Sequence, residues 1–433
     1  MAAVFGGVVA SVLAAISIVP FAVVRHWLDL RAGDGSADPY TPELHSRLAI
    51  AVVVASLLLG VGSGVFWRFG GIVELSVRRC LRRTWRLTVR LSPRDRKVVL
   101  CLAGIACIAA WVRSESLFQP MRFDESYTYL QYASQPLFVT VSKYDAPNNH
   151  VAHSVLVWAS TRLFGGSPQA IRLPALISGI LSVVVASCLV ARWTTPVVAL
   201  MTGFVLSVWS PLVEYSVNAR GYTLLQLLVL LLLLVTDEWM LRPKRAAAGA
   251  IGVLAGLALW TIPTAVYPLA MLLVLLVTRT TCDASESRRH QRWRDLVVAG
   301  AVTSGVSTWL YAPVLLVSGW KSLLPDSAAA QNADWSAVLR QSVFDTTELL
   351  LRDQSIWSCG VLGVGLLAAA VSQNRPLRWH TRAWLFGVCL CGTVVMAQGV
   401  VPPPRTWLFQ IPWGVCLAVC GAYELTGNLP WKR

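Results

Sequence analysis

Apolar residues gather along this chain into runs that are each long enough to cross a bilayer. A membrane-spanning helix needs about 17–25 predominantly apolar residues, and twelve such runs occur with polar segments between them. They lie at 3–24, 48–67, 97–114, 170–190, 196–213, 221–239, 246–262, 264–279, 296–317, 356–372, 383–400 and 406–424. The pattern predicts an all-α polytopic membrane protein with about twelve transmembrane helices.

The composition agrees with a membrane protein and excludes a water-soluble one. Hydrophobic residues make up 55% of the 433 residues and charged residues only 14%, whereas soluble domains carry roughly 25% charged residues. A net charge of +15 could indicate a nucleic-acid ligand. The basic residues lie beside the apolar runs, however, so we expect a lipid bilayer and no nucleic acid as the partner.

Basic residues also set the expected orientation in a cytoplasmic-type membrane. Ten Lys and Arg residues lie between positions 68 and 97, against two acidic residues, and such an excess is typical of cytoplasmic segments. If 148–168 forms a helix on the outer surface, the Arg-rich loops 279–295 and 375–382 and both termini are cytoplasmic too. A helix that crosses at 148–168 would move these basic loops outside, which disfavours that alternative.

The chain is expected to divide at about residue 97. Residues 1–96 would form two N-terminal transmembrane helices with a basic cytoplasmic connector, and residues 97–433 the main transmembrane unit. Two longer outer loops, 113–168 and 318–355, interrupt the main unit. Because these loops hold the polar clusters, we expect the chemistry at the non-cytoplasmic face.

The most informative of these clusters is in the first outer loop, at Met121-Arg-Phe-Asp-Glu-Ser-Tyr-Thr-Tyr-Leu130. Asp124 and Glu125 are adjacent carboxylates that follow an apolar run, among several tyrosines and with no lysine close in sequence. Carboxylates at a membrane surface are costly to desolvate. They are therefore either solvated or part of a reaction site, and the dipeptide alone does not decide between the two.

Three further motifs follow in order. They are Asp145-Ala-Pro-Asn-Asn-His-Val-Ala-His-Ser154, Phe164-Gly-Gly-Ser-Pro-Gln-Ala-Ile-Arg-Leu-Pro174 and Trp209-Ser-Pro-Leu-Val-Glu-Tyr-Ser-Val-Asn-Ala-Arg-Gly-Tyr222. With the Asp-Glu pair they resemble the GT-C glycosyltransferases, in the branch of the protein O-mannosyltransferases and the lipid A aminoarabinose transferases (glycosyltransferase family 39-like). The resemblance covers about 97–425 and implies a GT-C fold with surface helices in the first outer loop.

The resemblance also implies an activity. The protein would be an inverting glycosyltransferase that moves one sugar from a polyprenyl-phosphate donor to an acceptor hydroxyl at the non-cytoplasmic face. Asp124 would be the general base that takes the acceptor proton, and Glu125 would orient the acceptor or Asp124. The implied partners are the lipid-linked donor, the bilayer and an acceptor protein, lipid or glycan, and the sequence names neither the sugar nor the acceptor.

The leaving phosphate of such a reaction needs cationic partners, and two arginines are placed for it. Arg220 precedes the 221–239 run, and Arg405 lies in Val401-Pro-Pro-Pro-Arg-Thr-Trp407, which is similar to a Pro-and-Arg segment of the family. A guanidinium group binds phosphate oxygens bidentately and keeps its charge. The alternative for both is an arginine that extends to the membrane interface.

Histidines and polar residues complete the expected site. His150 and His153 lie three positions apart, so they would share one face of a surface helix, and they resemble a segment that lies beside the donor phosphate in relatives. The expected substrate contacts are Tyr127, Asn149, Glu214, Asn218 and Tyr222. Asn149 could instead cap the helix that follows.

One position departs from the family pattern. Where relatives often have Glu in Ser-Gln-Glu-Ala-Arg, this chain has Asn218, and the nearest carboxylate is Glu214. Either Glu214 replaces the missing carboxylate, or the site uses only the first acidic motif. No obligatory metal is therefore expected, with a divalent cation as the alternative. The cysteines, most of them within apolar runs, are expected to pack as small apolar side chains.

Two other functions are alternatives to the enzyme. A transporter of lipid-linked sugars would show internal repeats and charged residues at mid-membrane, whereas the acidic residues of interest here lie in outer loops. A GT-C-like scaffold without activity is the second alternative, because Asn218 occupies the second motif. An Asp124→Asn substitution separates these readings, since a scaffold would be indifferent to it.

Overall fold

The computed structural model describes residues 93–146, 148–323, 335–398 and 401–426, together with parts of 11–56. The chain divides into two compact units. The smaller comprises Met1–Leu91, Val141–Asp145 and Thr308–Leu323, and the larger comprises Ser92–Thr140, Ala146–Ser307 and Leu324–Arg433. Half of the predicted run 3–24, most of the run 48–67 and nearly all of the basic connector lie outside the described residues.

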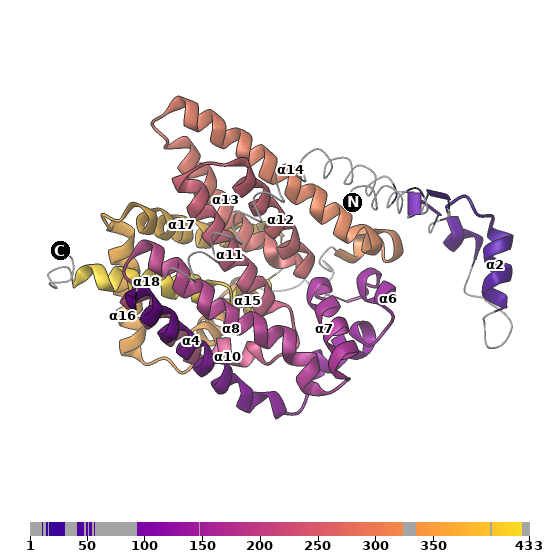
Figure 1. The fold of residues 1–433 in the computed structure, drawn as a ribbon, viewed down its shortest axis with the longest axis horizontal. Helices are drawn as coiled ribbons and strands as arrows, with labels where there is room; N and C mark the ends of the chain where they lie inside the picture. Colours follow the sequence, from indigo (N-terminus) through magenta and orange to yellow (C-terminus); the bar gives the residue numbers. More distant parts are fainter. Residues whose placement is uncertain are drawn as a thin grey trace. The chain divides into compact units, whose positions relative to one another are not determined.

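Every regular element among the described residues is a helix (Figure 1). In chain order they are α2 (Phe21–Asp29), α4 (Pro93–Ser114), η1 (Glu115–Phe118), α5 (Phe123–Thr128), the π-helix η2 (Tyr129–Ala133), α6 (Leu137–Ser142), α7 (Val151–Phe164), α8 (Pro168–Trp193), α9 (Pro196–Val208), α10 (Ser210–Ser216), α11 (Tyr222–Leu241), α12 (Arg245–Thr261), η3 (Pro263–Ala265), α13 (Val266–Thr281), α14 (Glu286–Val317), η4 (Trp320–Leu323), α15 (Trp335–Leu350), α16 (Ile356–Val371), α17 (Arg375–Gln398), η6 (Pro404–Trp407) and α18 (Gln410–Leu425). The predicted all-α architecture is confirmed.

Each of the ten predicted apolar runs from residue 97 onward coincides with a helix. Among the described residues, six helices are long and apolar enough to cross a membrane, and α9 with α10 forms a seventh if the bent pair is one span. The apolar helices α12 and α16 are shorter, so the number of twelve spans stays a prediction. Helix α7 has 14 residues and is about 21 Å long, which is too short for a hydrocarbon core of about 30 Å.

Two of the long helices begin where a Ser or Thr precedes a Pro. The hydroxyl of Ser167 accepts the N–H of Ala170 at 3.3 Å, and that of Thr195 accepts the N–H of Val198 at 3.5 Å. The following prolines occupy the first helical position, where a missing N–H costs no hydrogen bond. These caps start α8 and α9.

The run 196–213, predicted as one span, is broken into α9 and α10, which meet at an angle of 64°. The physical reason is Pro211, which has no N–H to donate to the carbonyl of Ser207 four residues earlier. Arg113 of α4 donates to that free carbonyl instead, at 2.7 Å. The buried arginine thus stabilises the bend at the point where the helix loses its own hydrogen bond.

Within the larger unit, α11 is the most enclosed of the candidate spans. In its most apolar stretch 67% of the residues are buried, against 56% for α8 and only 11% for the span that contains α4. A helix that is apolar all round belongs inside a bundle, and α11 lies among the other helices in Figure 1. Most apolar side chains of α4 remain exposed or half-buried, as expected of a helix that contacts lipid.

Helices α16 and α18 cross at glycines. A Cβ atom at Gly365 would collide with the carbonyl oxygen of Ala418, and one at Gly421 with the carbonyl oxygen of Gly365. The two backbones therefore touch without side chains between them, as at the small-residue crossings of membrane helices.

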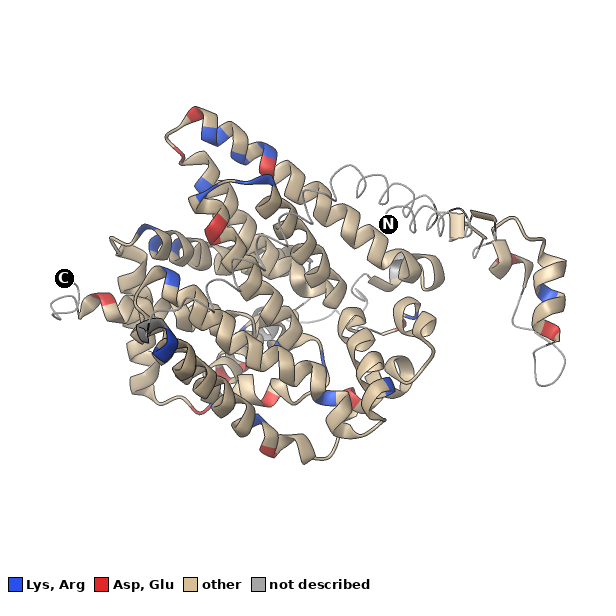
Figure 2. Cartoon of the chain, in the orientation of Figure 1, with Lys and Arg blue, Asp and Glu red and all other residues tan. Residues whose placement is uncertain are grey.

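Charged side chains lie mainly near helix ends, and the middles of the helices are largely uncharged (Figure 2). At the C-terminal end of α11, however, a buried polar cluster is formed by Asp237, His380 of α17 and Trp193 of α8. Asp237 contacts His380 Nε2 at 2.7 Å with one oxygen and accepts the Trp193 indole N–H at 2.6 Å with the other. The cluster ties three helices together.

The smaller unit contains a short hydrogen-bonded link around Ser318. Its hydroxyl donates to the carbonyl of Ser142 at 2.9 Å and accepts the N–H of Tyr144 at 2.8 Å. The link holds residues 142–144 against the segment that follows α14.

Candidate active site

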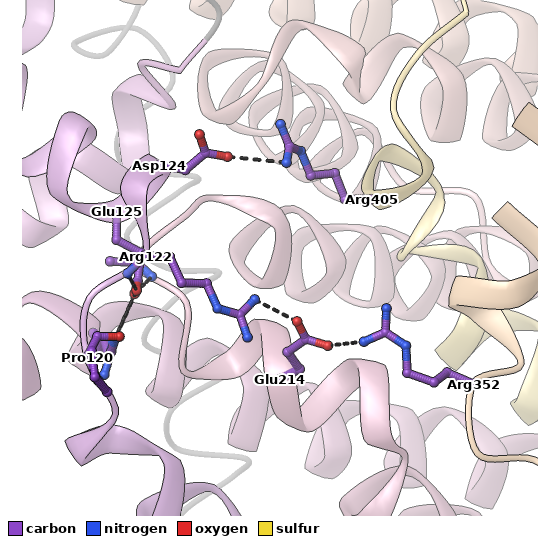
Figure 3. A network of polar contacts seen from close by, with 9 residues as sticks. Pro120, Arg122, Asp124, Glu125, Glu214, Arg352 and Arg405 are labelled. Carbon is purple, nitrogen blue, oxygen red and sulfur yellow. Dashed lines mark hydrogen bonds and ion pairs between the residues drawn. The ribbon is translucent and has the colours of Figure 1, made fainter. Parts of the chain in front are cut away.

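The carboxylate predicted to be the base, Asp124, lies in the first turn of α5. Its Oδ2 atom forms an ion pair with Nη1 of Arg220. The same atom pairs with Nη1 of Arg405 at 3.2 Å, as Figure 3 shows. The side chain of Asp124 is 29% exposed and that of Arg220 only 3%. The structure therefore brings together three predicted site residues that are far apart in the sequence, at a place that solvent can still reach.

Arg220 is held from several directions. Its Nη2 atom donates to Oδ1 of Asn148 at 3.2 Å, and its guanidinium group lies 5.5 Å from the ring centre of Tyr222. Its Nε atom is buried without a hydrogen-bond partner in the part of the chain that the structure describes. The arginine is fixed in place but keeps an unused donor.

His150 precedes α7 and lies against the same arginine. Its Nδ1 atom accepts the N–H of Gly221 at 2.8 Å, so a neutral ring carries its proton on Nε2, which lies 3.4 Å from Nη2 of Arg220. Burial, followed by the positive charge of Arg220, holds the pKa of His150 well below its ordinary value. The ring is therefore neutral and presents a donor beside the guanidinium group.

His153 lies one turn further along α7 and is fully buried. Neither ring nitrogen has a hydrogen-bond partner among the described residues. Burial, with the charge of Arg220 as the next cause, lowers the pKa of His153 to about 3. The two histidines do share the neighbourhood of Arg220, but His153 is closed off from solvent, and its predicted contact with substrate stays a prediction.

Glu125 has contacts of a different kind from those of its neighbour. Its side chain is buried and accepts two hydrogen bonds from Arg172 of α8, at 2.9 and 2.8 Å. The backbone N–H groups of Ala219 and Arg122 donate to the same carboxylate at 2.8 and 2.9 Å. Burial raises its pKa, but these hydrogen bonds outweigh burial and hold the pKa of Glu125 below its ordinary value. In this geometry Glu125 anchors the start of α5, and its predicted role in orienting the acceptor or Asp124 stays a prediction.

Glu214 of α10 forms a second ion-pair network. It binds Nη1 of Arg122 at 2.6 Å with one oxygen and Nη1 of Arg352, which follows α15, with the other (Figure 3). Glu214 therefore does not pair with Arg220 or Arg405. Its predicted contact with substrate would require one of its arginines to move.

The remaining predicted contacts differ in how open they are. Tyr127 is half-buried, and its ring lies 6.1 Å from that of Tyr132. Asn149 is buried, donating to the carbonyl of Thr140 at 3.1 Å and accepting the hydroxyl of Ser154 at 2.8 Å. It therefore ties the loop to α7.

The last two predicted contacts, Asn218 and Tyr222, are almost completely buried. Oδ1 of Asn218 has no hydrogen-bond partner among the described residues. Tyr222 begins α11 and packs edge to face on His150, with ring centres 4.9 Å apart. Tyr222 thereby lines the side of the site that is formed by Arg220 and His150.

Two cavities lie on either side of α10. One, of about 290 Å³, is bounded by Tyr215, by the last turns of α15 and by Arg405. The other, of about 350 Å³, is bounded by four valines and by five polar or charged residues, among them Arg122 and Glu214. The first is polar, and the second is mixed.

In the described part of the chain, no group of three or more His, Cys, Asp or Glu side chains is placed to hold a metal ion. The carboxylates of Asp124, Glu125 and Glu214 are each paired with arginine. The expectation of no obligatory metal stays a prediction.

Three arginines of the site are missing from the sequence-based prediction: Arg122, Arg172 and Arg352. Arg172 pairs with a carboxylate 47 positions away, and Arg352 with one 138 positions away. The motif Arg-Leu-Pro contains Arg172, but an ion pair over such a distance leaves no local signal in one sequence. The folded chain alone identifies the partners.

The chain is similar to known proteins in part of its sequence and in its fold. Residues 147–311 match the family model for dolichyl-phosphate-mannose-protein mannosyltransferases. Among solved structures, that of ArnT from Cupriavidus metallidurans in the apo state is similar, with a TM-score of 0.50 and 18% sequence identity. The match covers 79% of this chain and 62% of ArnT. No curated protein sequence matches the chain. The predicted GT-C fold and the resemblance to this branch of the GT-C family are confirmed.

Proposed function

We propose that this protein is an inverting glycosyltransferase that moves one sugar from a polyprenyl-phosphate donor to an acceptor hydroxyl at the non-cytoplasmic face of the membrane. Asp124 is the general base, and Arg220 and Arg405 bind the phosphate of the donor. The observation that carries the proposal is the convergence of these two arginines on one partly exposed carboxylate.

The surroundings of the arginines favour an anion. Helices α7, α8 and α11 all begin near this site, with His150 just before α7, Arg172 in the second turn of α8 and Tyr222 at the start of α11. The N-terminal end of a helix carries partial positive charge and binds phosphate readily. The neutral ring of His150 adds a donor on Nε2. A phosphate at Arg220 would therefore meet charge and hydrogen-bond donors together.

The chemistry requires the arginines to leave Asp124. In an inverting displacement the acceptor oxygen attacks the anomeric carbon on the face opposite the phosphate, so the base and the leaving group lie on opposite sides of the sugar. Arg220 and Arg405 cannot bind Asp124 and the phosphate at once in that arrangement. Binding of the donor therefore frees the carboxylate, and the base becomes available only when a sugar is in place.

In the transfer of the sugar, one bond forms, one bond breaks and one proton moves. The acceptor oxygen forms a bond to the anomeric carbon, the bond from that carbon to the phosphate oxygen breaks, and the acceptor proton passes to Asp124. A carboxylate is a weak base for an alcohol, so the proton moves late, as the new bond forms. The arginines stabilise the negative charge that grows on the phosphate. The products are the glycosylated acceptor and the polyprenyl phosphate.

Two further residues position this machinery. The bidentate pair of Arg172 with Glu125 holds the first turn of α5, and so the backbone of Asp124. A buried pair of this kind is fixed by its hydrogen bonds on both sides. Glu125 is thus a positioning residue in this mechanism.

The test is turnover by the purified protein in liposomes, with a panel of polyprenyl-phosphate sugars and a membrane extract as the source of acceptors. We expect transfer or slow hydrolysis of one donor, and its loss in Asp124→Asn. Glu115→Gln, which changes an exposed acid of η1, is the matched control and should keep the wild-type rate.

If no donor turns over while the protein remains folded, the scaffold or transporter readings gain support and the proposal fails. Equal turnover by the wild type and Asp124→Asn would support the glycosyltransferase activity but exclude Asp124 as its general base.

A further inference from the structure

The polar cavity beside the candidate active site has a regular construction. Asp345, Glu348, Leu349 and Arg352 recur at intervals of three and four positions, so they lie along one face of α15 and its extension. Arg405 and the prolines before it form the opposite wall, and the ring of Tyr215 closes one end. Arg405 is the link to Asp124, with which it forms an ion pair at 3.2 Å.

The wall formed by α15 is fixed to the rest of the unit at its C-terminal end. The indole N–H of Trp209 donates to the carbonyl of Leu350 at 3.2 Å, Arg352 pairs with Glu214, and the side chain of Leu349 is buried. The turn that follows places Asp353 in the left-handed region, with φ of 62°, a conformation that Asp adopts more readily than most residues. The cavity is therefore a built feature of the fold.

The charges that line the cavity are unequally matched. The two arginines are already paired with carboxylates outside the α15 wall, Arg352 with Glu214 and Arg405 with Asp124. Asp345 accepts only a neutral hydrogen bond, from the amide of Gln341 at 2.7 Å, and Glu348 forms no ion pair among the described residues. The cavity thus offers two carboxylate acceptors, arginine donors and one aromatic ring.

We propose that this cavity binds one sugar ring, whose hydroxyl groups donate to Asp345 and Glu348 while its face rests on Tyr215. Hydroxyl donors suit acceptor-only carboxylates, and a negatively charged sugar would be repelled. The volume of about 290 Å³ lies at the lower end of the range for ligand sites, roughly 300–1,000 Å³, which suits a single ring. The inference rests on the proposed function, because the bound sugar is taken to belong either to the donor or to a glycan acceptor of that reaction.

Binding is tested first without any turnover, by saturation-transfer NMR on the full-length protein in nanodiscs. The probes are methyl glycosides of neutral hexoses, pentoses and N-acetylhexosamines, with methyl glucuronide as the charged probe. We expect saturation of at least one neutral glycoside and little of the glucuronide. The double variant Asp345→Asn/Glu348→Gln should lose it, and Thr347→Ala, on the exposed face of α15, should keep it.

Saturation of no neutral glycoside, or saturation that the double variant retains, would overturn the proposal. The substitutions are nearly isosteric, and a circular-dichroism spectrum like that of the wild type shows that the fold is kept. Because this measurement needs no catalysis, it decides on the cavity even if the protein turns over no donor, and the two failures remain distinguishable.

Kinetics then identify which sugar occupies the cavity. If it is the donor sugar, Glu348→Gln raises KM for donor hydrolysis in the absence of acceptor roughly tenfold, the usual effect of losing one hydrogen bond to a charged group. If it is an acceptor sugar, hydrolysis is unchanged and transfer to the extract glycan falls by a similar factor. Unchanged KM in both assays would overturn the assignment to either sugar.

Discussion

Two polar clusters lie at opposite ends of α11 and use the same residue types in different ways. At the N-terminal end, Asp124 is partly exposed and shared by two arginines, each of which keeps an Nε donor without a partner among the described residues. At the C-terminal end, Asp237 is buried, and each of its oxygens has one close partner, His380 and Trp193. The first carboxylate can exchange its partners for a ligand, whereas the second has no access to one.

The difference shows what separates a reactive carboxylate from a structural one in this bundle. A buried carboxylate whose oxygens are both bound stabilises the packing of the helices around it, because leaving its donors unpaired would be costly. A partly exposed carboxylate that is paired with arginines can be released by an anion that competes for those arginines. Substitutions at four positions test this distinction.

The largest effect is expected at Asp124. Asp124→Asn removes the base but keeps the size of the side chain, so the rate of sugar transfer in liposomes should fall roughly 10²–10⁴-fold. The midpoint of thermal unfolding in detergent should change little, because the side chain is partly exposed. A large drop in that midpoint would instead assign Asp124 to the structural class.

Arg405 comes next. Arg405→Gln removes a cation that meets the leaving phosphate, and we expect kcat to fall roughly 10²–10³-fold, the usual cost of losing one donor to the transition state. Arg405→Lys should recover part of the rate. Arg162→Gln, at an exposed arginine of α7, is the control, and an equal loss there would point to a non-specific charge effect.

At the other end of α11 the effect should be on stability. Asp237→Leu leaves the buried donors of Trp193 and His380 without their acceptor, at a cost of about 1–3 kcal/mol for each unsatisfied group. The midpoint of thermal unfolding should fall, while the turnover of the folded protein below that midpoint is kept. Glu238→Gln, next to it but exposed, changes a pair with Arg192 at 3.7 Å and should cost little.

The smallest effect concerns pH. Because the pKa of His153 is held at about 3 in the folded protein and is about 6.5 in an unfolded chain, the unfolded state binds more protons between these values. Stability should therefore fall as pH decreases from 7 towards 5. In His153→Phe the free energy of unfolding should depend less steeply on pH, because the contribution of this one proton is lost. Thermal unfolding measured across the pH range tests this. An unchanged slope would mean that His153 is protonated in the fold.

Much of this fold could be predicted from the sequence, because the signal for a membrane helix is local. Every apolar run from residue 97 onward is helical, although 196–213 forms two helices, and the caps at Ser167 and Thr195 mark where α8 and α9 start. The break after α9 was missed although Pro211 is visible in the sequence, since a proline inside an apolar run is often tolerated by a membrane helix.

The candidate site was predictable where a motif carries it. Asp124, Arg220 and Arg405 were expected in one place, and the structure brings them together. The partners of Glu125 and Glu214 were not expected, because ion pairs between segments so far apart depend on how the helices pack. A charged residue in a loop shows that a partner is needed, but only the packing shows which one.

The close crossing of α16 and α18 has a mechanical consequence. Helix α16 follows α15 after a short turn, and α18 follows η6, so each side of the polar cavity is joined to one helix of this pair. The contact consists of glycine, backbone atoms and the small side chain of Ala369, so the pair has no long side chains that could absorb a shift. The two sides of the cavity should therefore move as one rigid body, and an alanine in place of Gly365 or Gly421 should displace Arg405.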